Sequence, residues 1–243
     1  MDNNFIHSED GYTREISREF FRNVYSYMFG ALGISGIIAY TCGTIEFYST
    51  YSLVEIGSNG KIISVSQVLW VLAFSPVVLG LVIQWAYERL SMGLLLGLFI
   101  AYSVLMGLSL SSIFFVYKLT AIAMTFFVTA GAFGGMAVLG YTTKTDLTKF
   151  GSLLYMVFIG MFIASLVNIF MDIQILDFII SILGVFVFTG LTAYHMQQLK
   201  GLSENAAISE SDRSKLALVG GLQLYILFVN LFLSLLRLMG GRD

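Results

Sequence analysis

The sequence is poor in charge. Only 12% of its 243 residues are charged, whereas soluble domains carry roughly 25%. Hydrophobic residues make up 57%, and one soluble core of this length cannot bury so much apolar surface, because burial grows slowly with chain size. These values exclude an ordinary soluble enzyme and a disordered chain. With 13 Lys and Arg against 15 Asp and Glu, they exclude a nucleic-acid binder as well.

Cysteine, proline and catalytic motifs are also scarce. Cys42 is the single cysteine, so no intramolecular disulfide can form and a Cys/His metal site is out of reach. Pro76 is the single proline, so long helices are interrupted almost nowhere. The sequence holds no Ser-His-Asp set, His-Glu-x-x-His motif or glycine-rich phosphate loop. It therefore predicts neither an enzyme nor a cofactor.

Long uncharged windows dominate what is present. A helix that crosses a bilayer needs roughly 20 apolar residues, and the shortest of seven uncharged windows has 21. Because the windows are continuously apolar rather than alternating, a β-barrel is excluded. The sequence predicts an all-α integral membrane protein with a bundle of seven transmembrane helices. The bounding charges are Arg22 and Glu46, Lys61 and Glu88, Arg89 and Lys118, Lys118 and Lys144, Lys149 and Asp172, Asp177 and Lys200, and Lys215 and Arg237.

Three segments are expected along the chain. Residues 1–23 are predicted to form a cytoplasmic amphipathic segment, since Ile16, Phe20 and Val24 recur every four residues. A solvated helical extension is the alternative for this segment. Residues 24–239 are the seven-helix transmembrane domain, with a long loop over 47–66 that carries a turn signal at 58–60. Residues 240–243 are a C-terminal tail.

The basic residues predict the orientation in the membrane. Nine Lys and Arg lie on the side of the N-terminus and four on the other side. Basic loops stay in the cytoplasm, so the N-terminus is expected to be cytoplasmic and the C-terminus outside. If the last helix re-enters instead of crossing, the tail returns to the cytoplasm. A bacterial cytoplasmic membrane is the expected location, and an internal eukaryotic membrane is the alternative.

Glycine spacing predicts close helix packing. Gly93 and Gly97 form one pair four residues apart, and Gly131 and Gly135 form another. Small residues at this spacing let helix backbones approach in membranes. Further glycines in the spans extend the pattern, namely Gly80, Gly107, Gly160, Gly184 and Gly190.

A polar stripe marks the last span. Its members follow one another at helical spacings of 4, 3, 4 and 3 residues: Gln223, Leu227, Asn230, Ser234 and Arg237. Leu227 is the one apolar member. Because polar side chains avoid lipid, the stripe should face the bundle interior, which makes the last helix central. Two interpretations stay open: the stripe lines a pore, or it is an interhelical hydrogen-bond seam.

The sixth span carries a titratable residue. Thr192, His195 and Gln198 share one helical face close to Lys200. An ionisable side chain in a membrane span is a functional candidate, and histidine titrates near neutral pH. The alternative is that His195 lies in the membrane interface without such a role. Arg89, at the end of the second span, is an interfacial anchor or turns inward.

Several segments resemble the Bax inhibitor-1 (transmembrane Bax inhibitor motif) family. They are GYTTKTDL at 140–147, GLSLSSIF at 107–114, AYHMQ at 193–197 where the family has Ala-Tyr-Asp-Thr-Gln, and most of 224–237. The resemblance extends from about Phe20 to Arg237. It implies seven helices and a pH-sensitive calcium leak across a membrane. It also implies, for some bacterial relatives, modulation of a membrane-bound protease.

The resemblance also assigns site residues. In the leak proteins two aspartates share a proton, and an arginine latches onto them; the matching positions here are His195, Leu227 and Arg89. Both aspartates are thus absent. The site loses its like-charge acid pair and its hard oxygen ligands for calcium. We therefore expect pH sensitivity that is lost or reversed relative to those relatives.

Two functions remain in competition. The first is a cation leak, with calcium or another cation passing along the stripe formed by Gln223, Asn230, Ser234 and Arg237 together with Thr192. The second is a non-conducting regulator that binds another membrane protein, such as a protease, through residues 1–22 or the loop at 197–214. An intramembrane hydrolase is remote, because His195 has no nucleophile beside it in the sequence.

Overall fold

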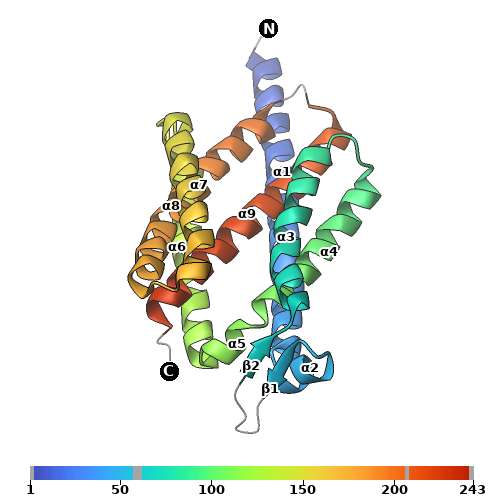
Figure 1. Cartoon of the computed structure of the whole chain (residues 1–243). Helices are drawn as coiled ribbons and strands as arrows, with labels where there is room; N and C mark the ends of the chain where they lie inside the picture. The colour runs from blue at the N-terminus through green and yellow to red at the C-terminus, as the bar shows by residue number, and fades with distance from the viewer. Residues whose placement is uncertain (1–2, 57–61, 206–207, 241–243) are drawn as a thin grey trace. The chain divides into compact units, whose positions relative to one another are not determined.

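The computed structural model describes residues 3–56, 62–205 and 208–240. Within them the chain forms helices throughout, apart from two short strands (Figure 1). The elements in order are α1 (Asn3–Cys42), α2 (Ile45–Thr50), β1 (Val54–Ile56), β2 (Ile62–Val65), α3 (Gln67–Ala86), α4 (Met92–Leu110), α5 (Ile113–Val116), α6 (Leu119–Thr142), α7 (Thr148–Met171), α8 (Gln174–Glu204) and α9 (Glu210–Met239).

The prediction of a seven-helix membrane bundle is confirmed. Seven helical segments in the described residues are long and apolar enough to cross a membrane, and each falls on one predicted window. They are Glu15–Cys42, Gln67–Ala86, Met92–Val116, Leu119–Thr142, Thr148–Met171, Gln174–Glu204 and Glu210–Met239. The last helix is the most enclosed, with 72% of its apolar window buried against 6% for α7.

The first helix runs without a break from Asn3 to Cys42. The predicted segment 1–23 is thus helical from Asn3 onward and continuous with the first span. Ser17, Phe20 and Val24 are buried, while Arg18 and Glu19 are exposed. The amphipathic face is therefore covered by protein, and its position relative to the membrane surface stays a prediction.

The segment predicted as a long loop contains secondary structure. Thr44 begins α2, because its hydroxyl accepts a hydrogen bond from the Phe47 N–H. β1 and β2 then pair antiparallel, with Val54 opposite Val65. Branched residues favour such pairing, and a local hairpin of this kind is compatible with an otherwise all-α membrane protein. The predicted turn at 58–60 lies outside the described residues.

Pro76 sits inside α3 without ending it. Proline lacks an N–H, so the carbonyl of Leu72, four residues earlier, loses its helical donor. The hydroxyl of Ser75 donates to that carbonyl at 3.0 Å. Hydroxyl side chains are one of the means by which membrane helices accommodate proline, and α3 accordingly keeps its full length.

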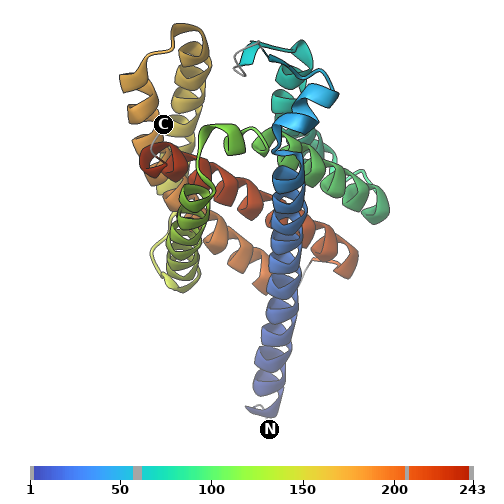
Figure 2. The same cartoon turned by 90° about the horizontal axis from the view of Figure 1, so that it is seen from below.

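The chain divides into two compact units, each described here by itself. Unit 1 contains residues 1–22, 119–209 and 223–243, and therefore α6, α7, α8 and the last part of α9. In it α8 contacts both α6 and α7, and the three helices lie side by side in both ribbon views (Figures 1 and 2). Phe228 of α9 packs edge-to-face on Phe126 and Phe133 of α6.

Unit 2 contains residues 23–118 and 210–222, and so includes α2, the strands, α3, α4 and α5. α3 packs along α4. Tyr48 of α2 is buried and its hydroxyl hydrogen-bonds to the Ser111 hydroxyl at 2.6 Å. Burial raises the pKa of Tyr48, although the Ser111 hydrogen bond opposes the shift. These contacts join α2 to the end of α4.

The glycines that pack tightly include Gly107, Gly184 and Gly190 of the predicted set but neither of the two predicted pairs. A side chain on Gly107 would meet the Ser35 backbone within unit 2, and one on Gly140 would meet the Ala193 backbone within unit 1. By contrast, nothing described lies within 4 Å of the Cβ position of Gly97 or Gly135, nor of their partners Gly93 and Gly131. The prediction that these pairs bring helices together is therefore wrong within this chain. Spacing alone does not say which way a helix face points.

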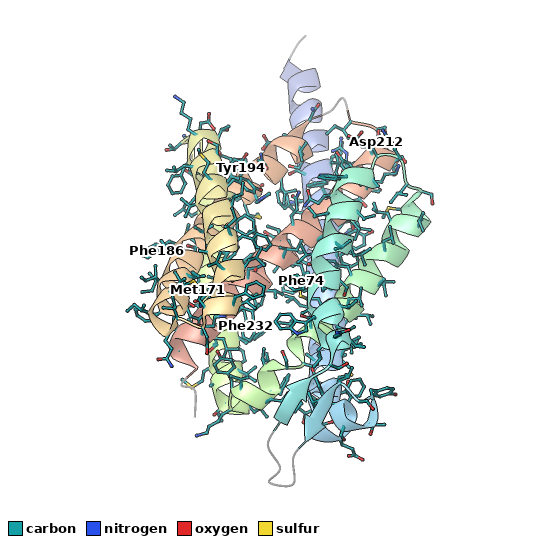
Figure 3. All side chains as sticks on the ribbon, viewed as in Figure 1. Phe74, Met171, Phe186, Tyr194, Asp212 and Phe232 are labelled. Carbon is teal, nitrogen blue, oxygen red and sulfur yellow. The ribbon has the colours of Figure 1, made fainter. Side chains whose placement is uncertain are left out.

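Large apolar side chains cover much of the outer surface, as a lipid-facing protein requires. Phe186 of α8 and Met171 of α7 point outward (Figure 3). Their exposed fractions are 70% and 58%. The low charge of the sequence is thus explained by its exposed side chains, many of which are apolar like those of the core.

Candidate functional site: a histidine–tyrosine pair and a polar pocket

His195 lies on α8 and is 7% exposed. Its Nε2 is 2.6 Å from the hydroxyl of Tyr155 on α7, a hydrogen bond that links the two helices. The Tyr155 and Tyr194 rings pack against the imidazole at steep angles. The sequence left open whether His195 is merely interfacial, and the structure encloses its ring in protein.

The other ring nitrogen of His195, Nδ1, is buried, and no described atom meets strict hydrogen-bond geometry with it. The side chain of Gln223 on α9 nevertheless interacts with the imidazole. A neutral imidazole has one donor and one acceptor nitrogen. Either Nε2 accepts from the Tyr155 hydroxyl and Nδ1 carries the proton, or Nε2–H donates to Tyr155 and Nδ1 is the acceptor. Gln223 of α9 is the polar neighbour of the ring, so the predicted stripe does begin beside His195.

Leu227 of α9 and Thr192 of α8, two further predicted site residues, are both buried. Leu227 is 6% exposed and Thr192 is fully buried. The Thr192 hydroxyl donates to the Phe188 carbonyl of its own helix at 2.7 Å. This bond lies within α8, so it joins Thr192 to no other helix, and the pore-lining role of Thr192 stays a prediction. Leu227 interrupts the polar stripe with an apolar side chain.

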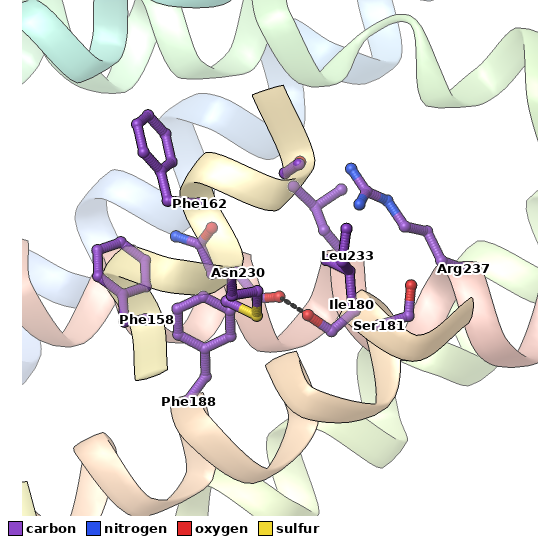
Figure 4. A pocket seen from close by; sticks show the side chains of 11 residues that line it. Phe158, Phe162, Ile180, Ser181, Phe188, Asn230, Leu233 and Arg237 are labelled. Carbon is purple, nitrogen blue, oxygen red and sulfur yellow. Dashed lines mark hydrogen bonds between the residues drawn. The ribbon is translucent and has the colours of Figure 1, made fainter. Parts of the chain in front are cut away.

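The remaining stripe residues line a separate pocket. Asn230, Ser234 and Arg237 face a cavity of about 110 Å³ between α7, α8 and α9 in unit 1 (Figure 4). The cavity is also lined by Leu233 of α9. The other lining residues come from α7 and α8, and they are Phe158, Met161, Phe162, Ser165, Ile180, Ser181 and Phe188. Figure 4 shows Phe158 and Phe162 on one side and Arg237 on the other.

An ion pair lies beside this pocket. A guanidinium nitrogen of Arg237 is 3.6 Å from Oδ1 of Asp177, which stands in the first turn of α8. Close approach of α8 and α9 nearby depends on Gly184, since a side chain there would overlap Ser234. Glycine at this position lets Ser181 and Ser234 line the same cavity.

Sequence reasoning missed three of these residues. Tyr155 is 40 positions from His195, and no spacing rule connects two different spans. In the sequence, Asp177 is only an acid next to a predicted loop, and Ser181 is one small residue among many in a span, so neither indicates a site. The one local signal is that Asp177, Ser181 and Gly184 fall on one helical face at i, i+4 and i+7.

The predicted latch residue Arg89 lies in unit 2, at the turn between α3 and α4. Its backbone N–H donates to the Ala86 carbonyl at 2.9 Å, and its side chain is exposed. His195 and Leu227 belong to unit 1. An attachment of Arg89 to that site stays a prediction.

The loop between α6 and α7 is held by α8. The side-chain amide of Gln197 accepts from the Leu147 N–H at 2.8 Å and donates to the Thr145 carbonyl at 2.7 Å. Asp146 accepts hydrogen bonds from the Thr148 hydroxyl and backbone N–H, which lower the pKa of its carboxyl. Two of the segments that resemble the Bax inhibitor-1 family, 140–147 and 193–197, are therefore in direct contact.

A family comparison decides the relationship. The sequence model described as inhibitor of apoptosis-promoting Bax1 matches residues 17–243. The chain belongs to this Bax inhibitor-1 family. It is 46% identical over 172 residues to inner membrane protein YbhL of Escherichia coli K12, covering 70% of this chain and 74% of that protein.

Two further bacterial relatives of this family member match nearly end to end. An uncharacterized protein of Borreliella burgdorferi is 41% identical over 229 residues, covering 93% of this chain and 94% of the relative. One from Caulobacter vibrioides is 39% identical over 227 residues, covering 92% and 89%. The chain is thus an integral membrane protein of the family, with a His–Tyr pair at its buried polar site.

Proposed function

We propose that this protein is a cation leak of the bacterial cytoplasmic membrane whose gating depends on His195. The observation that carries the proposal is the buried His195–Tyr155 hydrogen bond, which stands where the family resemblance places a carboxylate. Buried ionisable groups in membrane spans mark ion and proton paths. The pocket beside Asn230 and Ser234 supports a path along α9.

The location and orientation belong to the same proposal. One relative is named an inner membrane protein, and this chain has seven spans of suitable length and hydropathy. The excess of Lys and Arg on the side of the N-terminus supports a cytoplasmic N-terminus. Calcium or another cation would then leave or enter along the helices of unit 1.

The test is ion flux into liposomes that hold the purified protein and a calcium indicator, between about pH 5 and about pH 8. We expect flux that changes with pH in the unmodified protein and loses that dependence in His195→Ala. Protonated His195 would repel the guanidinium of Arg89, the predicted latch residue, whereas an aspartate pair would attract it. Acid should therefore not favour the closed form, and a flux curve like that of the aspartate-bearing relatives would contradict the proposal.

A second candidate is a non-conducting regulator of another membrane protein. Leu227 favours this alternative, because it is buried and its apolar side chain offers no oxygen ligand to a cation on the proposed path along α9. Flux that appears only in a His195→Asp/Leu227→Asp variant would support it. Co-purification from mild detergent, with and without residues 1–22, then tests for a bound partner, and a partner list that is empty in both would count against it.

A further inference from the structure

The pocket between α7, α8 and α9 is charged at one end and aromatic at the other. Among its described lining residues only Arg237 carries a charge, and it stands in the last turn of α9. Phe158 and Phe162 lie on the opposite side of the pocket from Arg237 (Figure 4). Phe158 and Phe188 are near the middle of α7 and α8. The cavity therefore runs from a cation at the end of one span to aromatic rings near the middle of two others.

The aromatic end suits an apolar occupant. The Phe158 ring contacts the rings of Phe162 and Phe188, with centroid distances of 6.3 and 5.9 Å. The cavity has a volume of about 110 Å³. An apolar cavity of about 150 Å³ holds a benzene molecule, so a few methylene groups of an alkyl chain fit between these side chains.

The polar lining residues on α8 and α9 already have partners for their donors. The Ser181 hydroxyl donates to the Asp177 carbonyl at 2.7 Å. The Ser234 hydroxyl donates to the Asn230 carbonyl at 2.8 Å. The side-chain nitrogen of Asn230 donates to the Ile226 carbonyl at 2.8 Å. A polar group left unpaired beside an apolar ligand would be unfavourable, but an alkyl chain can pass these groups without breaking a hydrogen bond.

The wall of the pocket at α7 reaches the lipid-facing surface. Phe162 lines the cavity and is also 41% exposed. Its neighbours Ile159 and Ile163 are exposed as well, and so are Ile179 and Leu183 of α8. Exposed apolar side chains on helices of this kind face lipid. A ligand of this pocket is therefore expected to enter from the bilayer.

The guanidinium of Arg237 can contact an anion at the charged end. Its distance of 3.6 Å from Oδ1 of Asp177 is longer than a hydrogen bond, and its side chain is 40% exposed. A guanidinium carries five N–H donors in a planar fork, which matches the oxygens of a phosphate. Asp177 does not line the cavity, so the charge that the pocket itself presents is positive.

We propose that this pocket binds a membrane phospholipid, with the phosphate on the Arg237 guanidinium and part of one acyl chain beside Phe158 and Phe162. In a bilayer the phosphates lie at the ends of the spans and the acyl chains fill the core of roughly 30 Å between them. The charge and the rings follow the same order along this pocket. The site exists whether or not the protein conducts ions.

Lipid binding also has a consequence that rests on the proposed function. An acyl chain in the cavity occupies the path along α9 beside Asn230 and Ser234. In a conducting protein the bound lipid therefore slows the leak, and a variant that loses the lipid conducts faster.

Retention of lipid by the purified protein in mild detergent tests the site. The protein is mixed with dioleoyl phosphatidylglycerol, with dioleoylglycerol, which has the same chains and no phosphate, or with oleate. Native mass spectrometry then counts the molecules that remain bound. We expect one phosphatidylglycerol to be retained, and dioleoylglycerol to bind about fivefold more weakly because it does not use the arginine. Equal retention of dioleoylglycerol would overturn the proposal, and oleate bound as tightly as phosphatidylglycerol would overturn a phospholipid as the occupant.

Arg237→Gln removes the proposed phosphate partner. Binding of phosphatidylglycerol should weaken by about fivefold, to the level of dioleoylglycerol. Arg22→Gln is the matched control, because Arg22 is also exposed and ion-paired, with Glu19 at 2.9 Å, but lies on α1, outside the pocket. Equal losses in the two variants would show a general attraction of lipid to basic residues and would overturn the site.

Asp177→Asn tests the sign of the charge effect. It removes the carboxylate that competes for Arg237, so phosphatidylglycerol should bind about twofold more tightly. Weaker binding in both Asp177→Asn and Arg237→Gln would contradict a phosphate on the guanidinium.

Ser165→Leu tests the acyl chain. Ser165 lines the cavity from α7, and a bulkier side chain there takes the space of the chain, so retention of phosphatidylglycerol should be lost. Ser152→Leu on the same helix is the control, because Ser152 is exposed and outside the pocket. Full retention in a folded Ser165→Leu variant would place the lipid elsewhere and overturn the site. The Arg237→Gln result decides the matter if Ser165→Leu does not fold.

Liposome flux separates this site from the leak. Retained phosphatidylglycerol that depends on Arg237, without flux of any ion, would support the site and refute the leak. Flux from a protein that retains no lipid would leave the leak standing and overturn the site.

Discussion

Two polar regions of unit 1 share α8 but differ in where their side chains form hydrogen bonds. At one, the ring of His195 on α8 packs against Tyr155 of α7, and its hydrogen bond runs between these two helices. At the other, Ser181 and Ser234 bond only to their own helices and border a cavity. In sequence the α9 residues of both regions form one stripe.

The difference lies in where the hydrogen bonds go. A bond between helices ties them together, whereas a hydroxyl bonded to its own backbone ties its helix to no neighbour. The His195 region should therefore contribute more to stability than the pocket region. The variants below test that division from the largest expected effect to the smallest.

Gly140→Ala should be the most damaging change. Its new methyl group would overlap the backbone of Ala193, two residues before His195, and a helix backbone cannot turn aside as a side chain can. We expect a loss of about 2–3 kcal/mol of stability, measured by chemical unfolding in detergent. Gly135→Ala on the same helix meets nothing within 4 Å. Equal losses in the two variants would contradict the packing described here.

Tyr155→Phe should come next. It removes the hydroxyl that hydrogen-bonds to Nε2 of His195 and leaves this buried nitrogen without its partner on α7. A buried polar group left unsatisfied costs about 1–3 kcal/mol. Tyr194→Phe is the control, because that hydroxyl bonds only to Gln198 at an exposed position. If both variants unfold at the same denaturant concentration, the His195–Tyr155 bond does not hold α7 to α8.

Gly184→Ala should cost less than Gly140→Ala, about 1 kcal/mol. The atom it meets first is the Ser234 hydroxyl, and this side chain can rotate. Combining it with Ser234→Ala should recover part of the loss, as expected for residues in contact. The unfolding free energies of the two single variants and the double variant measure this coupling, and simple additivity would show that the two residues act independently.

Asp146→Ala should have the smallest effect, and one that depends on pH. Hydrogen bonds from Thr148 lower the pKa of Asp146, so the folded state favours the carboxylate. The stabilisation is present above the unfolded pKa, about 4, and is lost as pH falls through the lower folded value. The difference in unfolding midpoint between protein and variant should thus be constant near neutrality and shrink in acid. A difference that grows on acidification would refute the assignment.

Much of the fold could be predicted because its signals are local. Each uncharged window must satisfy its backbone hydrogen bonds within itself in lipid, and this requirement fixes seven helices without knowledge of their neighbours. The polar stripe on α9 was likewise visible, and its helix is the most enclosed. The hairpin between β1 and β2 was missed, since its branched residues form runs too short to distinguish from a loop.

The candidate site could be predicted only in part. His195 and the stripe were identified from residue type and spacing, whereas Tyr155 and Asp177 were not. Their roles depend on which face of α7 meets α8 and on how far α8 lies from α9, and Gly184 sets the second distance. No periodicity within one helix contains that information.

The sequence by itself therefore determined the class of protein, the family and the approximate bounds of the spans, because hydrophobic length and backbone self-sufficiency are properties of single segments. The tertiary structure alone decided which glycines pack, how the stripe divides, and which side chains reach His195. Those outcomes depend on helix rotation and distance, and packing between segments far apart in the chain sets both.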